Sequence, residues 1–211
     1  MVNVDVDTLV VAGARVGIRA AGAGPVVLLV HGPLRSGAVF ADLLSRLASG
    51  GARAVAVDLP GFGRSDKPPE GLSGSELAAR LSAIGVVAGP PALVVAEGSG
   101  GDLAAAAFPA VPVWSLRAPI PRPRGLRAVP EPMLRAGIEV WARLGAPGLR
   151  GAARAEAALA ARSRGTRAAA ARWIRAEPLA ARPAIAERRR LDGSRPEEVS
   201  RAVLSFLGEQ R

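Results

Sequence analysis

The residues with the most evident chemical potential lie in a glycine-rich turn at 98–101, which contains Ser99 and follows Glu97. The apolar run before this turn is typical of a buried strand, and the alanine-rich run from Asp102 is typical of a helix. A sharp turn between a strand and a helix can present one side chain at its tip, as a nucleophile requires. Ser99 carries the only hydroxyl of the turn and is therefore a candidate nucleophile.

A serine nucleophile needs a base within hydrogen-bond reach, and the composition limits the choice. His31 is the only histidine, and it directly follows the apolar run V-V-L-L-V at 26–30. We expect His31 to order the loop after this strand by hydrogen bonding rather than to accept a proton. One histidine and no cysteine exclude a multi-histidine or thiolate metal site, and we expect neither a metal nor another cofactor.

Strand-like and helix-like segments alternate around the turn, which favours an α/β fold with a mostly parallel sheet. A hairpin is expected around Gly13, and continuous apolar runs predict buried strands at 26–30, 52–59, 92–96 and 112–116. Capping boxes predict two helix starts, one at Ser73 and the other at Ser194, each with a glutamate three residues later.

The segment 119–190 differs in kind from the rest of the chain. Five prolines fall between residues 119 and 132, and alanine- and arginine-rich stretches follow. These stretches predict helices at 132–144, 152–163 and 166–176, and no convincing strand is visible among them.

Three motifs resemble the α/β-hydrolase superfamily, near its epoxide hydrolases, haloalkane dehalogenases and esterases. They are H-G-P-L-R-S at 31–36, D-L-P-G-F-G-R-S-D-K-P at 58–68 and the glycine turn at 97–101, in that order. The resemblance implies an α/β-hydrolase-like fold with flanking helices, an N-terminal β-hairpin and a helical cap-like C-terminal half. The core would comprise 1–118 and 192–211, and the cap-like region would comprise 119–191.

The resemblance leaves two registrations of the nucleophile open. Aligning the double glycine at 100–101 with the family's G-H-S-x-G-G places Gly98 where the nucleophile belongs, and glycine has no group that could attack. A slipped alignment makes Ser99 the nucleophile but puts Glu97 at a position that requires glycine. We favour the first registration, which predicts a positive φ at Gly98.

The remaining catalytic parts that the resemblance implies are also missing. The family's histidine falls near Arg189, which cannot accept a proton, and no aspartate lies between Asp102 and Asp192. Pro33 follows the H-G pair and has no N–H for an oxyanion. The family's last two strands have no visible counterpart in the sequence.

We therefore predict a degenerate hydrolase homologue that binds a small apolar molecule or a protein partner without catalysis. The alternative is an active hydrolase of ester-like substrates with Ser99 as nucleophile, so whether the chain is an enzyme stays open. The predicted oxyanion and pocket residues are His31, Gly32, Pro33, Leu34, Phe62, Glu97, Gly98 and Ser99.

The net charge of +10 does not by itself indicate a partner. Residues 111–211 hold 20 basic and 9 acidic residues, and 27 of the chain's 28 basic residues are arginines. Such a bias is typical of a GC-rich bacterial genome, and no aromatic stacking run accompanies it, so we expect no nucleic-acid binding. Neither a signal peptide nor a run of 18 apolar residues is visible, and we expect a cytoplasmic protein without a membrane span.

Overall fold

A seven-stranded sheet forms the centre of the computed structural model, which describes residues 3–116, 128–144, 151–175 and 190–210. The strand order is β1-β2-β4-β3-β5-β6-β7, and β1 and β2 form the predicted hairpin. Strand β2 pairs antiparallel with β4, whereas every pair from β4 to β7 is parallel. The strands are β1 Asp5–Val11, β2 Ala14–Ala21, β3 Val26–Val30, β4 Arg53–Val57, β5 Leu93–Glu97, β6 Val113–Leu116 and β7 Arg190–Leu191.

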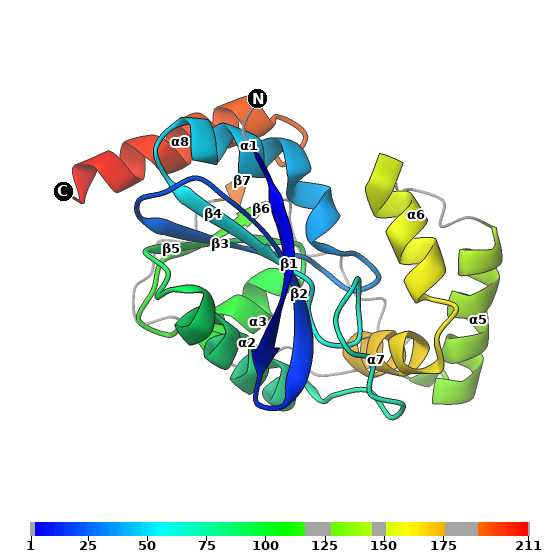
Figure 1. Cartoon of the computed structure of the whole chain (residues 1–211). Coiled ribbons are helices and arrows are strands. Elements are labelled where there is room, and N and C mark those ends of the chain that lie inside the picture. The colour runs from blue at the N-terminus through cyan, green and yellow to red at the C-terminus, as the bar shows by residue number, and fades with distance from the viewer. Residues whose placement is uncertain (1–2, 117–127, 145–150, 176–189, 211) are drawn as a thin grey trace.

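Helices cover both faces of this sheet, which confirms the predicted α/β class with a mostly parallel sheet (Figure 1). Helices α1 (Ala41–Ser49, preceded by the 3₁₀ turn Gly37–Phe40) and α8 (Pro196–Glu209) pack together on one face. Helices α2 (Gly74–Ala88) and α3 (Gly100–Ala107) pack on the other face. In the described parts of the chain, no helix combines the length and apolarity of a membrane span.

Side chains of β5 alternate between the two apolar cores. Leu93 and Val95 belong to the core under α1 and α8, whereas Val94 and Ala96 belong to the core under α2 and α3. Because successive side chains of a strand point to opposite faces, Glu97 continues toward the α1 side. The strand therefore delivers a carboxylate to one face immediately before the glycine turn.

Strand β7 corrects the expectation that no further strand follows β6. Ser115 pairs with Arg190, and Leu116 pairs with Leu191, in parallel register. Two residues are too few to show any apolar alternation, so this strand is defined by its pairing with β6 and not by a local sequence signal.

Of the two predicted capping boxes, only the first forms. The Ser73 hydroxyl accepts from the backbone N–H of Glu76, whose carboxylate accepts from the backbone N–H of Ser73 at 2.7 Å. The prediction of a capping box at Ser194 was wrong, because α8 begins at Pro196 and its N-cap residue is Arg195. There Asp192 Oδ1 accepts from both the backbone N–H and the hydroxyl of Ser194, at 2.9 and 2.7 Å.

Three helices, α5 (Glu131–Arg143), α6 (Gly151–Ala160) and α7 (Arg164–Arg175), lie beside one end of the sheet, at the right of Figure 1. They confirm the three helices predicted in this region, each starting one or two residues earlier than expected. The exact division between core and cap falls largely outside the described residues and stays a prediction. We refer to α5, α6 and α7 as the cap helices.

Helix α7 lies directly against the loop that follows β4. The hydroxyl of Thr166 donates to the backbone oxygen of Gly61 at 2.7 Å in a buried position. Gly165 has no room for a side chain, since a Cβ there would lie 2.3 Å from the backbone oxygen of Lys67. The cap is therefore seated on the core by backbone-to-backbone contact, which glycine permits.

Alanine substitutions at two cap glycines should have opposite effects on stability. Replacing glycine by alanine within a helix normally raises the free energy of unfolding by about 0.5–1 kcal/mol. Gly137→Ala on α5 should show this gain, because a Cβ there meets no atom within 4 Å. Gly165→Ala should instead lose about 1–3 kcal/mol, because it forces an overpacked contact. Urea denaturation of both variants checks this, and a gain in both would contradict the tight seating of α7.

Candidate functional site

Gly98 occupies the tip of the turn between β5 and α3. Its φ is +57°, which confirms the predicted positive φ, and a Cβ there would meet no atom within 4 Å. Its backbone N–H donates to the oxygen of Leu116 at 3.1 Å, which ties the tip to the end of β6. The tip thus has the left-handed backbone that a nucleophile would hold under strain, but glycine adopts it freely and leaves open space in place of a side chain.

Ser99 has an ordinary backbone and a different position from the tip. Its φ and ψ are −71° and −6°, and it is the N-cap residue of α3, although its side chain makes no capping hydrogen bond. Among the described residues no histidine or carboxylate is hydrogen-bonded to its hydroxyl. These angles agree better with the registration that puts Gly98 at the nucleophile's position.

His31 is completely buried at the end of β3, and backbone groups engage both of its ring nitrogens. Nε2 accepts from the N–H of Leu59 at 2.9 Å, so Nδ1 carries the proton and donates to the oxygen of Gly32 at 2.6 Å. Burial lowers the pKa of His31, although the charge of Asp58 acts in the opposite direction. The ring therefore joins the loop after β3 to the loop after β4 in its neutral form.

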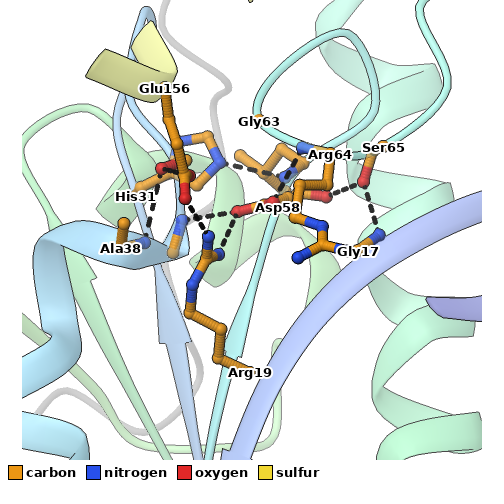
Figure 2. Close-up of polar contacts among 12 residues, drawn as sticks. Gly17, Arg19, His31, Ala38, Asp58, Gly63, Arg64, Ser65 and Glu156 are labelled. Atoms are coloured by element: carbon orange, nitrogen blue, oxygen red, sulfur yellow. Dashed lines mark hydrogen bonds and ion pairs between the residues drawn. The ribbon is translucent and has the colours of Figure 1, made fainter. Parts of the chain in front are cut away.

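The carboxylate of Asp58 is the centre of a buried polar cluster (Figure 2). It accepts from Nη1 of Arg19 at 3.1 Å and from the backbone N–H groups of Gly37 and Arg64 at 2.6 and 2.8 Å. The hydroxyl of Ser65 donates to the backbone oxygen of Asp58. One side chain thereby joins β2, the 3₁₀ turn and the loop after β4.

Arg19 extends this cluster to the cap. Its Nη2 lies 2.5 Å from Oε1 of Glu156 on α6, and the hydroxyl of Ser36 donates to Oε2 of Glu156 at 2.7 Å (Figure 2). The sequence prediction did not include Arg19, Ser36 or Glu156 in the site. The available signal was weak: an arginine within an otherwise apolar half of a strand, and a single acid within an alanine-rich helix.

The predicted pocket residues lie close together at the ends of β3, β4 and β5. A Cβ at Gly32 would lie 3.3 Å from the backbone oxygen of Glu97, so the loop after β3 runs beside the glycine turn. Phe62 is buried and packs edge-on between His31 and Trp173, at centroid distances of 5.8 and 5.7 Å. Leu34 is half-buried and packs against the same core.

A cavity of about 180 Å³ lies at the same edge of the sheet, on the face that α1 and α8 cover. The ion pair between Arg35 and Glu97, at 3.2 Å from Nη1 to Oε1, forms part of its lining. Glu97 is the one predicted pocket residue in this lining. The other described lining residues are Val39, Phe40, Asp42, Leu43, Leu116, Gly193, Pro196 and Val199.

Two further predictions concern a base and a metal. Arg189, near which the family's histidine falls, lies outside the described residues. In the described segments no group of three or more histidine, aspartate or glutamate side chains is arranged to hold a metal ion. In the described residues, the polar groups near the turn include backbone N–H groups, the hydroxyl of Ser99, the Asp58 cluster and the Arg35–Glu97 pair.

Comparison with known proteins gives a family for this arrangement. The sequence profile of the alpha/beta hydrolase family matches residues 27–208. The chain belongs to this family. The match runs from β3 to α8 and includes the cap helices.

Solved structures of other hydrolases share the fold. The epoxide hydrolase CorEH without ligand has a TM-score of 0.75 at 17% identity, covering 99% of this chain and 100% of that one. An epoxide hydrolase from an endophytic Streptomyces has a TM-score of 0.70 at 21% identity, covering 99% and 96%. At such identities the likeness establishes the fold alone.

Curated relatives match this hydrolase-family chain over short stretches. A haloalkane dehalogenase from Mycobacterium marinum is 47% identical over 45 residues, which are 21% of this chain and 15% of that protein. Epoxide hydrolase 1 from Siraitia grosvenorii is 38% identical over 69 residues, 33% of this chain and 22% of that protein. The matches thus span less than a quarter of either relative.

Replacing Gly98 should cost stability through backbone conformation alone. Gly98→Ala should lower the free energy of unfolding by about 1–2 kcal/mol, the usual cost of a left-handed backbone for a residue with a Cβ. Gly98→Asn should cost less, since asparagine tolerates this region better. Urea denaturation compares the two variants. An alanine variant as stable as the parent chain would contradict the positive φ.

Acid should destabilise the fold through His31. The pKa of His31 is lowered in the folded state, so the unfolded chain binds a proton at a higher pH than the folded chain does. The contribution of neutral His31 to the free energy of unfolding is therefore complete above the ordinary pKa of 6.5 and is lost as the pH falls below it. The slope for this one proton cannot exceed about 1.4 kcal/mol per pH unit, and it should develop as the pH falls below 6.5. Denaturation midpoints in this range measure it. His31→Gln should flatten the slope, and an imidazole signal titrating near 6.5 in the folded chain would contradict this prediction.

Proposed function

We propose that this alpha/beta hydrolase family member binds a small apolar molecule, or a protein partner, between the sheet edge and the cap without hydrolysing it. The observation that carries the proposal is the backbone of Gly98. The tip of the turn keeps the conformation that would present a nucleophile, and no nucleophilic atom stands there. Covalent catalysis of the family's kind requires that atom.

The surroundings of Gly98 support the same proposal. The ring nitrogens of His31 are engaged by backbone groups of Gly32 and Leu59, so this histidine does not serve as the base. Pro33 has no N–H to donate to an oxyanion, and a single such donor is typically worth about 2.7–4 kcal/mol in a transition state. Several independent parts of a hydrolytic site are thus unsuited to turnover.

The scaffold around the site is nevertheless well ordered by specific contacts. The Asp58 cluster joins the loops at the sheet edge, and Glu156 links them to the cap. A scaffold with these contacts and an open tip at Gly98 suits binding by shape and apolar contact. The ligand or partner, and the cytoplasmic location, stay predictions from the sequence.

The alternative function uses Ser99 as nucleophile. It would need a base that the described residues do not place beside the hydroxyl. Glu97, the neighbouring carboxylate, points to the α1 face and pairs with Arg35. The geometry therefore gives no specific support to this alternative, and it serves as the contrary outcome of the activity test.

The proposal predicts no turnover above background with activated esters, epoxides or haloalkanes, the last two chosen from the names of the relatives. Assays should cover about pH 5 to 9, where a histidine or carboxylate base would titrate. Gly98→Ser should not restore turnover, because a hydroxyl without a base is a weak nucleophile. At most it would acylate slowly with a very reactive ester, which mass spectrometry would detect.

Ser99→Ala provides the control for the same assays. If the parent chain turned over an ester and Ser99→Ala abolished that activity, the slipped registration would be right and the proposal wrong. Turnover that disappeared on repeated purification would come from a contaminating enzyme, whereas turnover that survived both Ser99→Ala and repeated purification would use another nucleophile and would contradict the proposal.

A further inference from the structure

Helix α5, at the outer edge of the cap in Figure 1, turns a stripe of apolar residues to solvent. Met133, Val140 and Leu144 are 65%, 57% and 68% exposed, and the exposed Gly137 lies between them. The four positions follow the spacing i, i+4, i+7 and i+11, so they share one side of the helix. Arg143, next to this side, is the one fully exposed charged residue of α5. We refer to Met133, Gly137, Val140 and Leu144 as the α5 stripe.

The two acidic residues of α5 lie on a different side of the helix from the stripe. Glu131 pairs with Arg175 and Glu139 pairs with Arg167, each at 3.7 Å, and both arginines belong to α7. Each carboxylate is also paired with an arginine of α5 itself, four residues further along the helix. The acids of α5 are thus compensated on the side that packs toward α7, and the stripe offers apolar atoms with a guanidinium beside them.

The part of the chain that contains α5 carries all of the excess positive charge. Residues 119–191 hold 16 arginines and 5 glutamates, a net charge of +11, whereas the remaining residues hold 12 basic and 13 acidic ones. Packed helices lie about 8–10 Å apart, which is close to the Debye length at physiological salt. Arginines of α6 and α7 therefore add to the electrostatic potential around α5, and this potential attracts an anionic partner.

Charge and side-chain chemistry together decide which partner suits the α5 stripe. A second copy of the chain would bring two strongly positive regions face to face, which opposes self-association through α5. Nucleic acid has the required charge, but its bases bind to aromatic side chains by stacking, and the large apolar residues exposed in the described chain are all aliphatic. An anionic lipid surface offers phosphate groups to arginines and hydrocarbon to aliphatic side chains.

We propose that the α5 stripe is a contact surface for anionic phospholipid bilayers. Met133, Val140 and Leu144 enter the boundary between headgroups and acyl chains, while arginines of the cap face the phosphates. The contact is peripheral and reversible, because a helix of 13 residues is about 20 Å long and only one of its sides is apolar and exposed. The proposal does not depend on whether the site at Gly98 binds or hydrolyses anything.

Co-sedimentation of the full chain with lipid vesicles tests the proposal. Vesicles of phosphatidylcholine with about 30% phosphatidylglycerol should bind at least about tenfold more tightly than vesicles of phosphatidylcholine alone, because only the former attract the positive cap. Raising the salt from about 0.1 to about 0.5 M should weaken this binding several-fold, since salt screens the attraction. No binding to the anionic vesicles, or equal binding to both kinds, would overturn the proposal.

Two pairs of substitutions assign the contact to α5. Val140→Ser removes apolar surface from the stripe without changing charge and should weaken binding to anionic vesicles about fivefold. Val86→Ser is its matched control, because it makes the same change at a 77% exposed valine on α2 and should leave binding unchanged.

Arg143→Gln should weaken binding about threefold. Its control, Arg46→Gln, removes another exposed arginine of an i,i+4 ion pair, on α1, and should change binding less. Vesicle binding that Val140→Ser and Arg143→Gln leave intact would overturn the role of the stripe. Thermal unfolding confirms that each of the four variants is folded.

The sequence contains no cysteine, so a label can be attached at a single introduced position. An environment-sensitive fluorophore on Met133→Cys should shift its emission to the blue on anionic vesicles, as the label leaves water for hydrocarbon. The same fluorophore on Val86→Cys should show no such shift. A shift at both positions, or at Val86→Cys alone, would contradict insertion through α5.

Sedimentation equilibrium and DNA binding test the other two partners. The chain should remain monomeric without vesicles, and a dimer that Val140→Ser dissociates would make the stripe a contact between copies and overturn the proposal. Binding to duplex DNA in the absence of any vesicle binding would overturn it as well. The outcome of the hydrolase assays would not affect it.

Discussion

The buried carboxylate of Asp58 is the interaction on which the arrangement of the site depends. It receives the Arg19 guanidinium from β2 and backbone N–H groups from the 3₁₀ turn after β3 and from the loop after β4. An ionised group without water must find such donors, and removing one partner of a buried pair typically costs about 3–5 kcal/mol. Through Arg19 the same constraint reaches Glu156, so the cap and the site loops are held by one connected set of charges.

Close backbone approach is the second constraint, and it explains the unusual composition. Aromatic residues make up 3% of the chain, and small residues take their place where elements meet. The buried alanines at 168–171 let α7 lie against the loop after β4, and Gly61 has a Cβ position only 2.6 Å from Ala169. Contacts of this kind bury little area per residue but leave no gaps, so the fold depends on small side chains at these positions.

The sequence was sufficient for the fold where the signal is local or periodic. The run V-V-L-L-V, the capping box at Ser73 and the glycine at position 98 each predict their backbone by a rule that acts within a few residues. Strand β7 escaped prediction because its conformation comes from pairing with β6. The salt bridge from Arg19 to Glu156 joins residues 137 positions apart, and nothing short-range indicates it. The cavity beside Arg35 likewise exists only after α1 and α8 have packed together.

Glu97 shows how one strand end can serve two different environments. The slipped registration would put Glu97 at a position that requires glycine, but strand alternation sends its side chain to the α1 face, where it pairs with Arg35. The next residue, Gly98, then turns away with a positive φ and leaves open space above the other side of the sheet edge. Two adjacent residues thus place a charged side chain on one face of the sheet and an open turn at its edge.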